Sequence, residues 1–164
     1  MSLKNIIHKI GERAKVASSQ LLNVKKDLKN QAIKKASELI CSSTSEIIEE
    51  NKKDIQFASD NNVPSAKINR LTLTASGIQN IASSLDGIIA LKDPIGKVLS
   101  EWTRPNGLRI QKVSVPIGVI GIIYESRPNV TIDASAISMK ASNAVILRGG
   151  KDSFYTSSKL YQII

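Results

Sequence analysis

Two short polar segments hold the residues of this sequence that are best suited to chemistry. They cover residues 125–129 and 148–151, and each follows an apolar run. Their members are Glu125, Ser126, Arg127, Pro128 and Asn129 in the first segment and Arg148, Gly149, Gly150 and Lys151 in the second. An arginine from each segment, together with Lys151, would form a concentrated positive site of the kind that binds phosphate.

A purely structural interpretation fits the same residues. Pro128 and Asn129 are suited to starting a helix, and Gly149–Gly150 is suited to turning the chain. The nearby "GVIG" is not the G-x-G-x-x-G fingerprint of dinucleotide-binding folds. From spacing alone, both interpretations stay open.

The flanking segments predict an α/β protein. Residues 118–124 and 143–148 are apolar throughout, as in strands of a parallel sheet that is covered on both faces. A helix over residues 129–142 joins them, and another helix follows to the C-terminus. The side chains expected towards the sheet are Ile132, Ala136, Ile137 and Met139. Ligands of open α/β sheets bind beyond the carboxyl ends of the strands, where both polar segments lie.

Residues 97–116 predict a β-hairpin arm. Asn106–Gly107 is a strong turn signal, because a type I′ turn needs two positive φ angles. The apolar residues change parity between Ile110 and Val113, which predicts a bulge or face switch near Gln111–Lys112.

Residues 1–96 predict a set of amphipathic helices without a catalytic constellation. Apolar residues recur at helical spacing from Leu3 to Ile10, and a second stripe continues through Leu28 and Ala32. The expected starts are Ser18 or Ser19 for the second helix, one of residues 43–45 for the third, and Thr72 or Thr74 for the fourth, which carries Ile78, Ile81, Leu85 and Ile88 on one stripe.

Composition excludes several classes of protein. The 164 residues are 41% hydrophobic and 23% charged, as in a globular domain. No apolar run reaches the roughly 18 residues of a membrane span. The single cysteine, Cys41, excludes an internal disulfide and a cysteine-based zinc cluster, and it fits a reducing compartment. It lies on the apolar face of an expected helix, so we interpret it as a buried, inert thiol. With His8 as the one histidine, no metal site is expected.

The formal charge of +9 is concentrated near the N-terminus, since residues 1–35 contain nine cationic and two acidic side chains. A transit peptide, a membrane-surface helix and a nucleic-acid patch are alternatives to an ordinary solvated helix face. We favour the solvated face, because this segment has no aromatic residue for base stacking.

Several motifs together resemble the gamma-glutamyl phosphate reductases of the aldehyde dehydrogenase superfamily. They are "NRLTLT", "LKDPIGKV", "WTRPNGLRI", "VPIGVIGIIYESRPNVTIDASA" and "SNAVILRGGK", in the order and at the spacing of that family. The resemblance implies three regions: an N-terminal helical region over 1–96, a β-hairpin arm over 97–116, and an incomplete nucleotide-binding β-α-β-α unit of a Rossmann-like parallel sheet over 117–164.

The resemblance also implies a chemistry, the cytoplasmic reduction of glutamyl 5-phosphate to glutamate 5-semialdehyde by NADPH in proline biosynthesis. Arg148 matches the position at which related dehydrogenases hold the adenosine ribose. Lys151 replaces a glutamate of many NAD enzymes, which suits the 2′-phosphate of NADP. Residues 125–129 match the loop beside the nicotinamide, with Asn129 as the implied oxyanion contact.

The nucleophilic cysteine of that family lies in a separate downstream domain, and Cys41 does not match it. We therefore expect a truncated homologue that is catalytically inactive alone. One piece of a split reductase completed by a second chain, and a non-catalytic binding or assembly module, are the alternatives. Because the arm of that family joins a sheet in a neighbouring subunit, a homo-oligomer through residues 97–116 is implied. No metal, membrane or nucleic-acid partner is expected.

Overall fold

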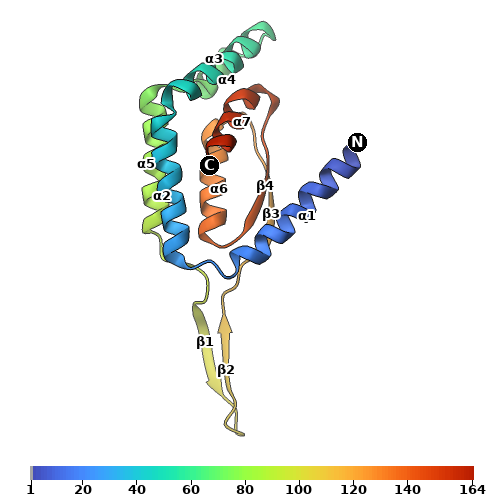
Figure 1. The fold of residues 1–164 in the computed structure, drawn as a ribbon, viewed down its shortest axis with the longest axis vertical. Coiled ribbons are helices and arrows are strands. Elements are labelled where there is room, and N and C mark those ends of the chain that lie inside the picture. The colour runs from blue at the N-terminus through green and yellow to red at the C-terminus, as the bar shows by residue number, and fades with distance from the viewer. Residues whose placement is uncertain (1) are drawn as a thin grey trace.

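The computed structural model describes residues 2–164 as a mixed α/β fold (Figure 1). The elements are α1 (Leu3–Leu21), α2 (Lys26–Ser42), α3 (Thr44–Asp60), α4 (Ser65–Leu71), α5 (Ala75–Ala90), β1 (Val98–Thr103), β2 (Arg109–Val113), β3 (Val119–Ile123), α6 (Pro128–Lys140), β4 (Ala144–Arg148), the 3-10 helix η1 (Lys151–Ser153) and α7 (Phe154–Ile163). Within residues 2–164, none of the helices combines the length and the apolar character that crossing a bilayer requires.

One hydrophobic core joins the N-terminal helices to the C-terminal β-α-β-α unit. Helices α2 and α5 lie side by side, and both contact α6, while α1 lies on the other side of β3 and β4 (Figure 1). Ile33, Leu85, Ile132 and Leu160 are all buried in the same cluster, although they come from α2, α5, α6 and α7. Each such side chain contributes roughly 1.5–3 kcal/mol on burial.

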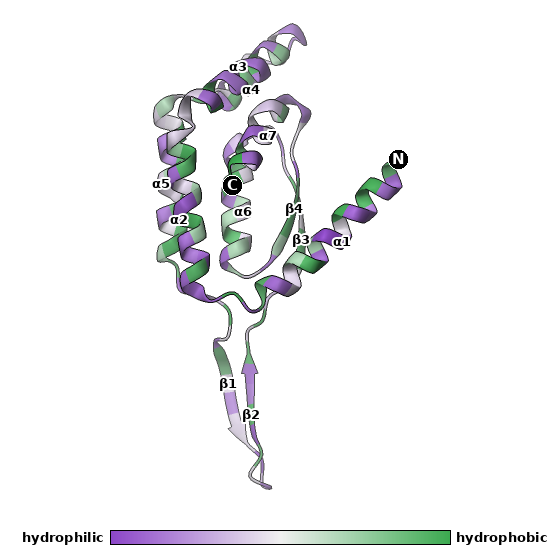
Figure 2. Cartoon of the chain, viewed as in Figure 1, coloured by the Kyte–Doolittle hydropathy of each residue, from purple (hydrophilic) through white to green (hydrophobic). Residues whose placement is uncertain are grey.

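The helical pattern was predicted correctly for α5 and α3 and incorrectly for the start of α2. Ile78, Ile81, Leu85 and Ile88 are buried, and the Thr74 hydroxyl caps α5 by accepting the Gly77 N–H at 3.1 Å. Ser18 and Ser19 do not start a helix: α1 continues through them because both hydroxyls bond to the carbonyl of Lys15. Figure 2 shows hydrophilic and hydrophobic residues alternating along α1, α2 and α5, as amphipathic helices require.

The buried face of two helices differs from the predicted face. In α2 the buried residues are Lys29, Ile33, Ser37 and Ile40, whereas Leu28 is exposed. The stripe is therefore displaced by one residue, because the side chain of Lys29 finds polar partners inside the fold. In α6, Ile137 is 53% exposed and is not part of the buried face, which includes Ile132 and Ala136.

Lys29 is buried because its ammonium group is fully partnered. Its Nζ lies 2.7 Å from Asp93 Oδ2 and donates to the Lys140 carbonyl and to Ser142 Oγ, both at 3.0 Å. Desolvation favours the neutral form of Asp93, but the bonds from Lys29 and from the Ile95 N–H outweigh it and hold the pKa of Asp93 below its ordinary value. The Lys29–Asp93 ion pair therefore holds the segment between α5 and the arm against α2 and α6.

The predicted hairpin arm is present and stands away from the rest of the molecule (Figure 1). Strands β1 and β2 pair antiparallel, with Trp102 opposite Ile110. The register shift lies in β1, between Val98 and Ser100. The extra residue is Leu99 in β1, opposite Lys112 and Val113, so the bulge predicted at Gln111–Lys112 lies on the other strand of the hairpin.

The turn of the arm is not a two-residue type I′ turn; instead Arg104 and Pro105 lengthen the loop, which is the alternative that these residues allowed. Gly107 has φ +84°, but Asn106 does not have a positive φ. The Gly107 N–H donates to the Arg104 carbonyl at 2.9 Å, and the Leu108 N–H donates to Asn106 Oδ1 at 3.1 Å. The asparagine side chain therefore closes the loop instead of its backbone adopting a left-handed conformation.

The parallel pairing of β3 and β4 confirms the predicted sheet, but the predicted cover on both faces is wrong for β3, whose residues alternate between exposed and half-buried. Val119 pairs with Ala144, and the register runs without a shift to Ile123 and Arg148. The Asn143 side chain fixes the start of β3 by accepting the Gly118 N–H at 2.9 Å. Because the two strands end together, the two polar segments lie at the same edge of the sheet.

Candidate functional site

A cavity of about 280 Å³ opens at the carboxyl ends of β3 and β4. Its wall has three parts: one side of α4, the loop after β3 and the loop after β4. The lining residues are Lys67, Arg70, Tyr124, Glu125, Ser126, Arg127, Gly150, Lys151 and Asp152. The structure thus brings together the predicted residues 125–127 and 150–151, and it adds two cations from α4 that the sequence analysis did not identify.

The two strand-end loops approach each other so closely that a side chain at either glycine would meet the loop after β3. A Cβ at Gly150 would lie 2.7 Å from Ser126 Oγ, and one at Gly149 would lie 3.0 Å from the Tyr124 hydroxyl oxygen. Both distances are shorter than an ordinary van der Waals contact. Ser126 Oγ also donates to Asp152 Oδ2 at 3.1 Å, which joins the loops directly. Gly150 lines the cavity at the point where the two loops come closest, and Gly149 lies beside it.

Four of the predicted site residues do not line the cavity. Pro128 is buried in the first turn of α6, and the Asn129 amide donates to Asp133 Oδ2 at 3.2 Å, one turn along that helix. Arg148 is exposed, and its guanidinium group donates to the carbonyl of Gly149. These residues lie next to the cavity without contributing to its wall.

The cations of α4 face the cavity because the other side of this short helix is buried. Leu71 is fully buried and Ile68 is half-buried, while Lys67 and Arg70 are exposed. Pro64, which precedes the helix, and the apolar spacing of Ile68 and Leu71 were the available sequence signals for it.

Helix α3 holds two walls of the cavity at a fixed separation. Asn51 Nδ2 donates to the Leu71 carbonyl at the end of α4, at 2.9 Å. One turn along α3, Asp54 accepts the N–H groups of Tyr155 and Thr156 at 3.0 and 2.8 Å, and it thereby caps α7. Asn51 Nδ2 also donates to Thr156 Oγ1 at 3.1 Å. Since α7 follows directly on the loop after β4, both walls depend on the same buried pair of side chains.

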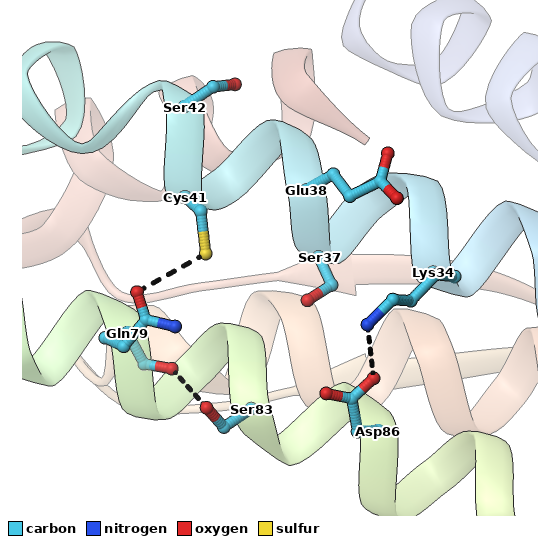
Figure 3. A pocket seen from close by; sticks show the side chains of 8 residues that line it. All are labelled: Lys34, Ser37, Glu38, Cys41, Ser42, Gln79, Ser83 and Asp86. Atoms are coloured by element: carbon cyan, nitrogen blue, oxygen red, sulfur yellow. Dashed lines mark hydrogen bonds and ion pairs between the residues drawn. The ribbon is translucent and has the colours of Figure 1, made fainter.

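The single thiol lies in a separate, open groove between α2 and α5, whose volume is about 530 Å³ (Figure 3). Cys41 is half-buried rather than fully buried as predicted, and its Sγ donates to Gln79 Oε1 at 3.6 Å. The carboxylates of the groove are engaged, Asp86 by Lys34 at 3.0 Å and Glu38 by Lys35 at 3.2 Å. The hydrogen bond to Asp86 raises the pKa of Lys34. This arrangement provides no free base for the thiol.

The groove of Cys41 and the strand-end cavity share no lining residue. Over residues 2–164, no group of three or more His, Cys, Asp or Glu side chains is placed to hold a metal ion. The strand-end cavity, with its basic walls, is therefore the place in the described structure that is best suited to an anionic ligand.

Gamma-glutamyl phosphate reductases are similar in sequence to this chain. No family model matches the sequence. The gamma-glutamyl phosphate reductase of Opitutus terrae is 46% identical over 162 residues, which is 99% of this chain and 38% of that protein. The corresponding protein of Brucella suis is 42% identical with the same coverage. This chain is homologous to the N-terminal portion of gamma-glutamyl phosphate reductase.

Solved structures agree with this assignment. The gamma-glutamyl phosphate reductase of Thermotoga maritima superimposes with a TM-score of 0.91 at 38% identity, covering 93% of this chain and 37% of that one. The Saccharomyces cerevisiae reductase gives a TM-score of 0.89 at 28% identity, covering 94% and 40%. A probable aldehyde dehydrogenase from Listeria monocytogenes shares the fold, with a TM-score of 0.68 at 15% identity. The chain spans about two fifths of the reductases it matches, since it covers 38% of the two sequence relatives.

Proposed function

We propose that this chain forms the nucleotide-binding portion of a cytoplasmic reductase that converts glutamyl 5-phosphate to glutamate 5-semialdehyde in proline biosynthesis. The observation that carries this proposal is the cavity at the strand ends, which Arg127, Gly150 and Lys151 line together. Homology to gamma-glutamyl phosphate reductase supports the reaction, and the single cysteine of the sequence fits a reducing compartment.

The residues present fit a nicotinamide nucleotide, and we propose NADP as the cofactor. Bound NADPH would supply the hydride for the reduction. Arg127 and Lys151 would neutralise phosphate oxygens, and the missing side chain of Gly150 would let a phosphate approach the backbone. Glu125 would accept hydrogen bonds from ribose hydroxyls. Arg148, at the end of β4, would reach the adenosine ribose from outside the cavity.

We further propose that the chain is inactive by itself. The one thiol, Cys41, lies in a groove separate from the cavity, and its neighbouring carboxylates are ion-paired. A nucleophile for the acyl phosphate would therefore have to come from outside residues 1–164. Incubation of the purified chain with glutamate 5-semialdehyde, phosphate and NADP should give no NADPH above a buffer blank, and turnover above that blank would show this proposal to be wrong.

Nucleotide binding is tested separately, by titrating the chain with NADPH and following backbone amide resonances. We expect weak binding, with shifts confined to residues 124–127 and 149–152, because this chain spans only part of its relatives. Saturating NADPH that moves resonances elsewhere, or none at all, would contradict the proposed site.

A second candidate function is that of one piece of a split reductase. It is favoured by the exposed apolar residues of the sheet, since Ile117 is 81% and Ile123 is 85% exposed. We propose that a second chain, carrying the remaining portion of the reductase, covers them. Mixing the two chains should restore reductase activity, whereas two chains that neither associate nor turn over substrate would exclude this function.

A further inference from the structure

We infer that Lys67 and Arg70 of α4 select nucleotides that carry a phosphate monoester at the ribose 2′ position. The inference rests on the proposed function, because it assigns a role within the same cavity. Neither residue belongs to the strand-end segments that the sequence analysis connected with the nucleotide. Both come from a helix that is distant in sequence and that forms the third wall of the cavity.

Charge balance is the first argument. The loops after β3 and β4 contribute Arg127 and Lys151, and they also contribute Glu125 and Asp152. These two cations and two carboxylates cancel, so the strand-end walls alone carry no net charge. The two cations of α4 supply the whole positive excess of the cavity. A ligand group with two negative charges matches that excess, whereas an uncharged ribose hydroxyl does not.

The second argument is that the cavity cations are not engaged within the chain. Of the ion pairs formed among residues 2–164, none within 4.0 Å includes Lys67, Arg70, Arg127 or Lys151. Elsewhere in residues 2–164, six lysines and arginines have a carboxylate partner within 4.0 Å, among them Lys34 with Asp86 and Lys159 with Glu46. The two carboxylates of the cavity leave a net positive charge and form no close ion pair with its cations, and a bound anion would lower the repulsion among those cations.

The third argument is that α4 is held in place rather than free to move away. Asn51 bonds the last carbonyl of α4 and also accepts the Leu73 N–H at 2.8 Å, and Asp54 on the same helix caps α7 beyond the opposite wall. The backbone that carries the α4 cations is therefore held beside the opening. A guanidinium and an ammonium group from α4 would bind a phosphate dianion by charge-assisted hydrogen bonds.

The test compares four nucleotides: NADP, NAD, 2′-AMP and 5′-AMP. Each is titrated calorimetrically, at low and high salt, into the wild-type chain and into the double variant Lys67→Gln/Arg70→Gln. Lys112→Gln, on an exposed strand of the arm, is the control for loss of positive charge outside the cavity. Arg70→Lys keeps the charge but removes the planar fork. Because both α4 side chains are exposed, the variants should fold like the wild type, which circular dichroism checks.

We expect the double variant to lose about tenfold or more in affinity for NADP and 2′-AMP, with NAD and 5′-AMP little changed. Arg70→Lys should restore part of the preference, and Lys112→Gln should retain all of it. A wild-type preference for 2′-phosphorylated nucleotides that survives in the double variant overturns this inference and leaves the proposed function standing. Wild-type protein that binds none of the four overturns both.

Discussion

Asp54 offers the sharpest test of how the cavity is built. Its carboxylate is 1% exposed and accepts three hydrogen bonds, from the Tyr155 N–H, the Thr156 N–H and the Thr156 hydroxyl. Replacing Asp54 by Ala leaves all three donors without a partner inside the protein. A lost helix cap costs about 0.5–2 kcal/mol, and a buried donor left unpaired costs about 1–3 kcal/mol.

Part of that cost is recovered, because burying a carboxylate carries a desolvation penalty that the alanine avoids. We therefore expect Asp54→Ala to lower the free energy of unfolding by about 3 kcal/mol, and Asp54→Asn, which keeps one acceptor, to lower it by about half as much. Urea denaturation measures both. The matched control is Asp60→Ala on the same helix, whose exposed carboxylate bonds only Gln56, and it should change stability by less than about 0.5 kcal/mol.

The same variants should loosen the cavity before they unfold the protein. Amide hydrogen exchange at residues 151–157 should accelerate in Asp54→Ala, while exchange in α5 should follow global unfolding. If Asp54→Ala were as stable as the Asp60→Ala control, the carboxylate would not be the cap that its distances describe, and the argument for a preorganised wall would fail with it.

Three further predictions follow from other contacts. Gly150→Ala should weaken NADPH binding and destabilise the fold, because its Cβ would lie 2.7 Å from Ser126 Oγ. The control Gly121→Ala, whose Cβ would meet nothing within 4 Å, should not affect the cavity. Isothermal titration and thermal melting compare the two variants. The pKa of Asp93 is lowered on folding, so the stabilisation from its pair with Lys29 is present above the ordinary value of 3.8 and is lost as the pH falls through the folded pKa. In urea titrations below about pH 4, the free energy of unfolding should therefore fall more steeply with pH for the wild type than for Asp93→Asn. The arm should mediate self-association, since Trp102 and Leu108 are exposed and β1 has an unpaired edge. Analytical sedimentation should show wild-type oligomers that dissociate in Leu108→Lys. A wild-type monomer at high concentration would exclude this role.

The elements governed by a simple period could be predicted from the sequence. The stripe of α5 follows the helical period and the two strands are continuous apolar runs, so both could be predicted, and a strand pair with matched ends brings residues 125–127 and 150–151 together. Predictions of burial were less reliable where the position of a side chain depends on one specific polar partner. Lys29 is charged and nevertheless buried, which no hydrophobic pattern indicates, since its place depends on Asp93, 64 positions away in the numbering.

The α4 wall of the cavity could not be predicted for a related reason. Lys67 and Arg70 are ordinary surface cations in the sequence, and only the contacts of Asn51 with the end of α4 bring them to the strand ends. Such a contact joins residues through a polar side chain rather than through periodicity. In the sequence, Asn51 and Asp54 fall on the same helical stripe as Ile47 and Ala58, and this was the local sign that polar side chains of α3 contact other elements.

The turn over residues 140–143 receives both connections of the arm. On one side Lys29 links Asp93 to the Lys140 carbonyl, and on the other Asn143 holds the N–H of Gly118. The five residues of β4 then connect this turn to the Gly149–Gly150 loop beside the cavity. Both connections of the arm and the start of β4 therefore share one turn, so a partner that binds the arm binds an element attached to the strand that ends at the Gly149–Gly150 loop.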